Sequence, residues 1–278
     1  TVTRNAGFTL GGLNFASHTL TLGSATTDLT LVDNSSSSSS SNTSPPGTFA
    51  TQTADLTYIS SGAADITTGT TITSTGGKFS FANGIKINGS TISLDDTTLA
   101  VGDNLTKTGG TLTLNQSDLE LISNLTLSSD AAMVFDSFIP NAKNLELASS
   151  STAEVTVGNL NLASASIDVK GGTLNISGGS VGANGELEIG GSGTLKLGGD
   201  LAVTGIINLN DGATTTFAGN KIDVSGGTLK LAGTHSLDSI TTNDQTKLQI
   251  NNSANVSRSD AGTSTLGSLT YSQAGNSG

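Results

Sequence analysis

The chain has no cysteine, no tryptophan and only three prolines. Without cysteine, no disulfide framework, thiolate chemistry or cysteine zinc cluster can form. Hydrophobic residues make up 34% of the chain and aromatic residues 4%, which is little apolar bulk for a thick globular core. Val, Ile and Leu nevertheless alternate with polar residues too regularly for a disordered chain. A narrow core lined by every second residue of short strands reconciles these observations.

Basic residues are also scarce. Lys and Arg number 11 against 22 Asp and Glu, so the net charge is −11. Such a surface repels polyanions, so we expect no nucleic-acid partner. No apolar run approaches the length of a membrane span, so we expect no membrane insertion. The chain begins at Thr1 without a basic-then-apolar leader, and we expect a processed secreted chain or a piece of a longer one.

One motif, a strand followed by a Gly-Gly turn and a second strand, occurs twice. Residues 167–178 read IDVKGGTLNISG, and residues 222–233 read IDVSGGTLKLAG. Similar short strands fill residues 7–250 without the helical patterns of a βαβ protein. The same strand sequences could build an antiparallel β-sandwich, so the choice between the two folds depends on the repeats.

The spacing of the repeats favours a solenoid. The pattern Gly-Thr-Leu-x-[Ile/Leu] at Gly172 recurs at Gly193, and about 20 residues suit one coil of a three-sided parallel β-helix. The offset of 55 residues between the two longer copies then corresponds to about three uneven coils. We predict an all-β fold, a single right-handed parallel β-helix over residues 1–252. A polar C-terminal tail or a final irregular coil is expected over residues 253–278.

One segment interrupts this pattern. Residues 34–47 contain seven consecutive serines, Ser35 to Ser41, and then Pro45-Pro46-Gly47. Serine cannot contribute to an apolar core, and proline cannot sit in a central strand. We therefore predict a loop inserted into the solenoid at residues 34–47.

Acidic residues offer no convincing site. Asp95-Asp96, with Asp103 nearby, is the one carboxylate doublet that we single out, and it is expected to be a solvated corner rather than a metal site. In the two motif copies, Lys170 aligns with a serine and Lys230 with an asparagine, so no charge cluster repeats. The repeated motif therefore indicates a structural element rather than a functional site.

Other motifs are weaker still. The two histidines, His18 and His235, are predicted at the surface, and His235-Ser236 with Asp238 has the letters of a catalytic triad but not its context. Residues 190–193, Gly-Gly-Ser-Gly, are expected to form a turn rather than a phosphate loop. We predict no catalytic, cofactor-binding or metal-binding residues and no enzyme.

Threonine pairs raise one further possibility, because threonine ladders on flat solenoids can bind ice. The pairs are Thr19/Thr21, Thr71/Thr73 and Thr111/Thr113. Their spacing in the sequence is irregular, and Lys, Asn and Asp occupy equivalent positions elsewhere. The high β-propensity of threonine is therefore the expected explanation.

The Gly-Gly-Thr-Leu-x-[Leu/Ile] strands, the Asn-Gly turns and the abundance of Thr, Asn and Ser resemble bacterial right-handed parallel β-helix surface proteins. Autotransporter passengers and large adhesins belong to this group, and the likeness covers most of residues 7–250. The resemblance implies export, an extracellular or cell-surface location, a stalk-like shape and adhesive or self-associating roles.

We therefore expect a non-catalytic extracellular structural protein: a self-associating filament or biofilm-matrix subunit, or an adhesin stalk. It would act through its solenoid faces and open ends, with residues 2–22 as the expected donor strands. Further copies of the chain and cell-surface or host glycans are the expected partners. The alternative is a polysaccharide-binding or polysaccharide-cleaving β-helix protein. Such a protein needs an aromatic platform, and Tyr58 and Tyr271 are the only tyrosines.

Overall fold

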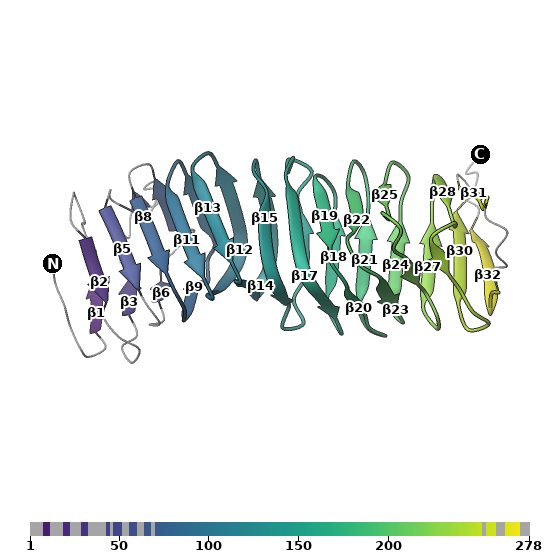
Figure 1. Cartoon of the computed structure of the whole chain (residues 1–278), viewed down its shortest axis with the longest axis horizontal. Coiled ribbons are helices and arrows are strands. Elements are labelled where there is room, and N and C mark those ends of the chain that lie inside the picture. The colour runs from purple at the N-terminus through teal and green to yellow at the C-terminus, as the bar shows by residue number, and fades with distance from the viewer. Residues whose placement is uncertain are drawn as a thin grey trace, which may run out of the picture. The chain divides into compact units, whose positions relative to one another are not determined.

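In a computed structural model, the described strands stack in parallel as a β-solenoid (Figure 1). The structure describes residues 8–11, 19–22, 29–32, 43–44, 47–51, 56–59, 64–67, 70–251, 254–259 and 265–272. These residues are all-β, which confirms the predicted fold class. They include no helix that could cross a bilayer. The chain divides into two compact units, Thr1–Asn141 and Ala142–Gly278, and each is described by itself.

The described part of the first unit contains strands β1 to β15. Their bounds are β1 Phe8–Gly11, β2 Thr19–Leu22, β3 Leu29–Val32, β4 Thr43–Ser44, β5 Gly47–Thr51, β6 Leu56–Ile59, β7 Ala64–Thr67, β8 Thr70–Ser74, β9 Lys78–Phe81, β10 Ile85–Asn88, β11 Thr91–Asp95, β12 Thr98–Thr108, β13 Thr111–Asn115, β14 Asp118–Ser129 and β15 Met133–Ile139.

The strands of the first unit form three parallel ladders. The first runs β1, β3, β6, β9 and then the initial halves of β12 and β14. The second runs β4, β7, β10 and the final halves of β12 and β14. The third is a five-stranded sheet in the order β13, β11, β8, β5, β2. The coils from β3 to β13 therefore each contribute one strand, or half of one, to each ladder.

Strand β12 serves two ladders because it bends at Gly102. Its register against β14 shifts between Val101 and Asp103. A Cβ atom at Gly102 would overlap the backbone oxygen of Ala82 in the preceding coil. Only glycine allows the two coils to approach this closely at the bend.

The described part of the second unit contains strands β16 to β32. Their bounds are β16 Leu145–Leu147, β17 Glu154–Leu162, β18 Ser166–Val169, β19 Thr173–Ile176, β20 Gly179–Val181, β21 Glu186–Ile189, β22 Thr194–Leu197, β23 Leu201–Val203, β24 Ile206–Leu209, β25 Thr214–Thr216, β26 Ile222–Asp223, β27 Thr228–Leu231, β28 Thr234–Ser236, β29 Ile240–Thr241, β30 Lys247–Asn251, β31 Asn255–Ser257 and β32 Ser268–Ser272.

Three parallel ladders also build the second unit. The first runs β16, β18, β21, β24, β27, β30 and β32. The second runs from the initial part of β17 through β19 and β22 to β25. The third runs from the final part of β17 through β20, β23 and β26 to β29. Thr173 pairs with Thr194, so the repeat from Gly172 to Gly193 is one coil, as predicted. Strands β28 and β31 pair separately.

The interpretation of the longer repeat is wrong. Ile167 lies in β18, on the ladder that continues through Leu187 of β21. Ile222 lies in β26, on the ladder that contains Leu201 and Ile240. The two motif copies therefore occupy different faces of the solenoid, and their offset is not a whole number of coils. Similar sequences recur because the strands of every face need the same alternation of apolar residues before and after a turn.

The core is a set of stacked apolar columns. Along most strands of the second unit, burial alternates with every residue, as the pleat requires. One column consists of residues that are at most 5% exposed: Leu145, Ile167, Leu187, Ile207, Leu229 and Leu248. Each fully buried side chain of this kind contributes about 1.5–3 kcal/mol.

Two segments with predicted boundaries are described only in part. Residues 34–42 and 45–46 of the predicted serine loop lie outside the described residues. Within its predicted range, Thr43–Ser44 form β4 and pair with β7, and Gly47 begins β5. Beyond residue 252, β31 pairs with β28 and β32 pairs with β30.

Candidate functional site

A lysine occupies one position of an apolar column in the first unit. Lys107 of β12 pairs in register with Ile87 of β10 and with Ser129 of β14. Its side chain is only 3% exposed. A lysine is almost never buried to this extent unless its charge is paired. It is therefore the most unusual ionisable group among the described residues.

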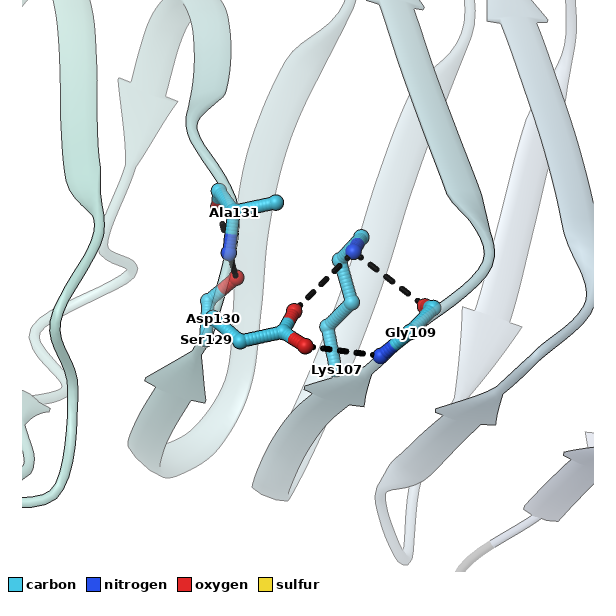
Figure 2. Close-up of polar contacts among 5 residues, drawn as sticks. All are labelled: Lys107, Gly109, Ser129, Asp130 and Ala131. Atoms are coloured by element: carbon cyan, nitrogen blue, oxygen red, sulfur yellow. Dashed lines mark hydrogen bonds and ion pairs between the residues drawn. The ribbon is translucent and has the colours of Figure 1, made fainter.

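The ammonium of Lys107 is satisfied at the adjoining corner (Figure 2). Its Nζ donates to the backbone oxygen of Gly109 at 3.2 Å and to Oδ1 of Asp130 at 3.1 Å. The other oxygen of Asp130 accepts a hydrogen bond from the Gly109 backbone N–H at 2.8 Å. The hydrogen bond from Gly109, and then the one from Lys107, hold the pKa of Asp130 below its ordinary value.

This arrangement stabilises a corner and leaves no free reactive group. The carboxylate of Asp130 reaches back one coil and is 48% exposed, whereas the lysine is buried. Beside them, the Ser129 hydroxyl donates to the backbone oxygen of Ala131 at 2.7 Å. The lysine is paired and the serine is engaged with its own turn. The cluster therefore fits a structural role better than nucleophilic or acid–base chemistry.

The predicted carboxylate doublet forms solvated corners. Asp95 Oδ1 accepts a hydrogen bond from the Asn115 side chain at 2.5 Å. Asp96 and Asp103 adopt positive φ angles of 51° and 62°, which is the conformation of turn residues. The Asp103 backbone N–H donates to the Ser123 hydroxyl at 2.8 Å. Across the part of the chain that the structure describes, no group of three or more His, Cys, Asp or Glu could hold a metal ion.

The expectation of a surface histidine is wrong for His235. This residue is 6% exposed, and its Nε2 lies 2.7 Å from the backbone oxygen of Ala232. Ser236 is exposed because neighbouring residues of a strand face opposite ways. Asp238 instead accepts hydrogen bonds from Ser259. His235, Ser236 and Asp238 therefore do not form a catalytic triad. The other histidine, His18, lies outside the described residues.

The Gly-Gly-Ser-Gly segment is a tight turn, as expected. The Gly193 N–H donates to the Gly190 oxygen at 2.9 Å, and Gly191 has a φ of 57°. The turn joins β21 to β22 within one coil. Backbone geometry accounts for the glycines without a bound phosphate.

The charges of the repeated motif form separate ion pairs. Lys170 Nζ lies 2.6 Å from Glu146 Oε2 and 3.5 Å from Asp168 Oδ2, and these partners, with the hydrogen bond to Glu146 contributing most, raise the pKa of Lys170. In the other copy, Lys230 pairs with Glu186 at 3.3 Å. The two copies therefore share no charge constellation, as expected.

Other outward charges form ion pairs along the solenoid axis. Lys196 Nζ bonds Glu154 Oε2 at 2.5 Å, two coils back. The hydrogen bond from Lys196, followed by the one from Asn175, lowers the pKa of Glu154. Such exposed pairs are each worth about 0–1 kcal/mol. The pairs of Lys196 and Lys230 each link residues two coils apart.

The last described strand has an uncovered apolar side. Leu269 and Tyr271 of β32 pair in register with Leu248 and Ile250 of β30. They continue inward-facing columns, yet Leu269 is 63% exposed and Tyr271 is 59% exposed. Within the described ranges, β32 pairs with β30 on one edge and with no strand on the other.

No known protein family, curated protein or solved structure matches this chain.

Proposed function

We propose that the chain is a non-catalytic structural protein that associates end to end, as a filament or matrix subunit or an adhesin stalk outside the cell. The observation that carries this proposal is the uncovered apolar side of β32. Leu269 and Tyr271 stand in columns that are closed elsewhere by the next coil. An additional coil supplied by another copy would close them in the same way.

The burial gained by such a contact is substantial. In the same ladder, Leu229 is 0% exposed and Leu231 is 1% exposed, whereas Leu269 and Tyr271 are more than half exposed. Full burial of an exposed side chain is worth about 1.5–3 kcal/mol, so covering the exposed three-fifths of these two is worth about 2–4 kcal/mol in total. Backbone hydrogen bonds along the open edge of β32 would add to this gain. The cost of association reduces the net affinity below the gross value.

The proposed occupant is the first strand of a second copy. Strand β1 has the apolar-polar-apolar pattern Phe8-Thr9-Leu10. Within the described ranges it pairs with β3 on one edge only. Joining β1 of one copy to β32 of another is a head-to-tail contact between different surfaces. Such contacts do not close on themselves unless the rotation permits a ring, so they generate filaments.

The acidic charge gives the assembly a predictable salt dependence. Each copy has a net charge of −11, so approaching copies repel one another at low ionic strength. Added salt screens this repulsion over a Debye length of about 8 Å at physiological concentration. We therefore expect filaments to lengthen as salt is raised.

The test compares two lysine substitutions by light scattering and electron microscopy. Leu269→Lys places a charge in the uncovered column and should leave the protein monomeric. Val134→Lys is the matched control, because Val134 of β15 is also exposed, at 54%, but does not lie on an end strand. Monodisperse monomers of the unmodified chain at high concentration and high salt would refute the proposal. Equal assembly of both variants would refute the role of β32. A glycan array probed with the monomeric variant tests the alternative expectation of polysaccharide binding.

A further inference from the structure

The threonine pairs, irregular in the sequence, are aligned in the third ladder of the first unit. Strands β2, β5, β8, β11 and β13 lie side by side in one sheet (Figure 1). One column of paired positions is threonine in all five strands: Thr19, Thr48, Thr71, Thr91 and Thr111. The column two residues further along is Thr21, Ala50, Thr73, Ser93 and Thr113. We call these two columns the threonine face.

The irregular spacing arises outside the strands. Residues between β2 and β5, which include the serine tract, lengthen the sequence between Thr19 and Thr48 without changing the register. From β8 onward the coils have equal length, so Thr71, Thr91 and Thr111 are evenly spaced. Irregular spacing in the sequence therefore does not exclude a threonine ladder in this sheet.

The side chains that the structure describes on this face are available to a ligand. Thr91, Thr111 and Thr113 are exposed, and Thr73 and Ser93 are half-buried. Their strand neighbours Ile92 and Leu94 are buried. The hydroxyl and methyl groups therefore point outward from a strand whose other side is anchored in the core.

Neither column contains a charged residue, unlike the other faces. On the first ladder of the same unit, Lys78 pairs with Glu120 at 2.8 Å. On the second ladder, Lys86 of β10 is exposed. Asp95 follows Thr91 and Ser93 along β11, and it is hydrogen-bonded to Asn115 at the ends of β11 and β13. In a protein with a net charge of −11, an uncharged face of this size favours an uncharged ligand.

The paired strands of the face form a two-dimensional array. Strands in a sheet are separated by about 4.8 Å, and alternate residues of one strand by about 6.7 Å. Threonine is β-branched and has few χ1 rotamers, so its hydroxyl and methyl positions are largely fixed before any ligand arrives. An array with two regular repeats matches a ligand that is itself periodic. The prism face of hexagonal ice has oxygen rows with repeats close to these two lengths.

We propose that the threonine face binds the surface of ice. The methyl groups would lie in the spaces of the lattice while the hydroxyls replace water molecules in its rows. This proposal does not depend on end-to-end assembly, because the face contains no residue of β1 or β32, the two strands of the proposed end-to-end contact. The parallel ladder supplies the spacing, and threonine supplies both chemical groups.

The test measures thermal hysteresis, the shape of growing ice crystals and partition of the protein into a slowly growing ice front. The unmodified chain should shape crystals and enter the ice. Thr91→Lys places a long charged side chain within the threonine face and should abolish most of both effects. Thr106→Lys is the matched control, because Thr106 is an outward threonine paired with Lys86 on another ladder. It should behave as the unmodified chain does.

Three results would overturn the proposal. Exclusion of the unmodified chain from ice is the first, and equal activity of Thr91→Lys and the unmodified chain is the second. The third is adsorption to a crystalline uncharged polysaccharide such as chitin, lost in Thr91→Lys, without any effect on ice. Circular dichroism of both variants establishes that a loss of activity is not a loss of fold.

Discussion

Shortening the buried Lys107 side chain tests what holds the interior of the first unit together. The side chain is 3% exposed and occupies a core position between Ile87 and Ser129. Lys107→Ala removes three buried methylenes as well as the ammonium. At about 0.8 kcal/mol per methylene, the loss is about 2.4 kcal/mol before any cavity remains to be counted.

Lys107→Met separates the hydrocarbon stem from the charge. Methionine retains most of the length and apolar character of the stem. Asp130 keeps the hydrogen bond from Gly109 and is 48% exposed, so removing the ammonium leaves no buried carboxylate. We therefore expect Lys107→Met to lie within about 1 kcal/mol of the unmodified chain.

The assay is urea denaturation followed by circular dichroism, with midpoints compared at equal slope. Lys86→Ala is the control because Lys86 is exposed on the neighbouring strand β10, and it should change the stability by less than about 0.5 kcal/mol. If Lys107→Met is as destabilised as Lys107→Ala, the ion pair rather than the stem stabilises the corner, and the reasoning is wrong.

Three further predictions concern the second unit and use the same assay. Leu187→Ala should cost about 2–5 kcal/mol, because this residue is fully buried in a stacked column; a loss below about 1 kcal/mol would mean that the column is loosely packed. The lowered pKa of Glu154 stabilises the fold at neutral pH, and this contribution disappears as the pH falls through the folded-state pKa. Glu154→Gln should therefore be less stable than the unmodified chain at pH 7 and equal to it in acid, whereas a constant difference across pH would contradict a charged contact with Lys196. Gly185→Ala should destabilise strongly because its Cβ would overlap the backbone oxygen of Leu162, and a neutral effect would show that the coils can separate there.

The fold was predictable because one residue pattern serves every coil. Alternating apolar residues define the inward side of a strand, and the recurrence at Gly172 and Gly193 indicates the length of a coil. The copies at Ile167 and Ile222 were misinterpreted because strands on different faces have the same requirements. Sequence similarity therefore identifies strand–turn–strand units but not the face on which each unit lies.

The buried polar residues were missed for a different reason. Lys107 stands two residues after Leu105, and strand parity places both side chains on the inward side. His235 is likewise inward while its neighbours are exposed. Judging these residues by polarity alone puts them at the surface. What the sequence does not show is that a nearby corner supplies partners, which are Gly109 and Asp130 for the lysine and Ala232 for the histidine.

The alignment of the threonine face could not be predicted from the sequence. Each pair was visible in the sequence, but its alignment with the next pair depends on the number of residues in the intervening turns and loops. Only the register of β2, β5, β8, β11 and β13 shows that the pairs form columns. A one-residue slip in any coil would turn these threonines toward the core.

Hydrogen exchange in β32 tests the proposed end-to-end assembly most directly. One edge of this strand is bonded to β30, and in the proposed assembly the amides of the other edge bond to a second copy. The account predicts that these amides become protected as protein concentration and salt are raised, while exchange in the interior strand β24 does not change. It also predicts that Leu269→Lys removes this dependence on concentration. Exchange in β32 that is the same at all concentrations would contradict the account.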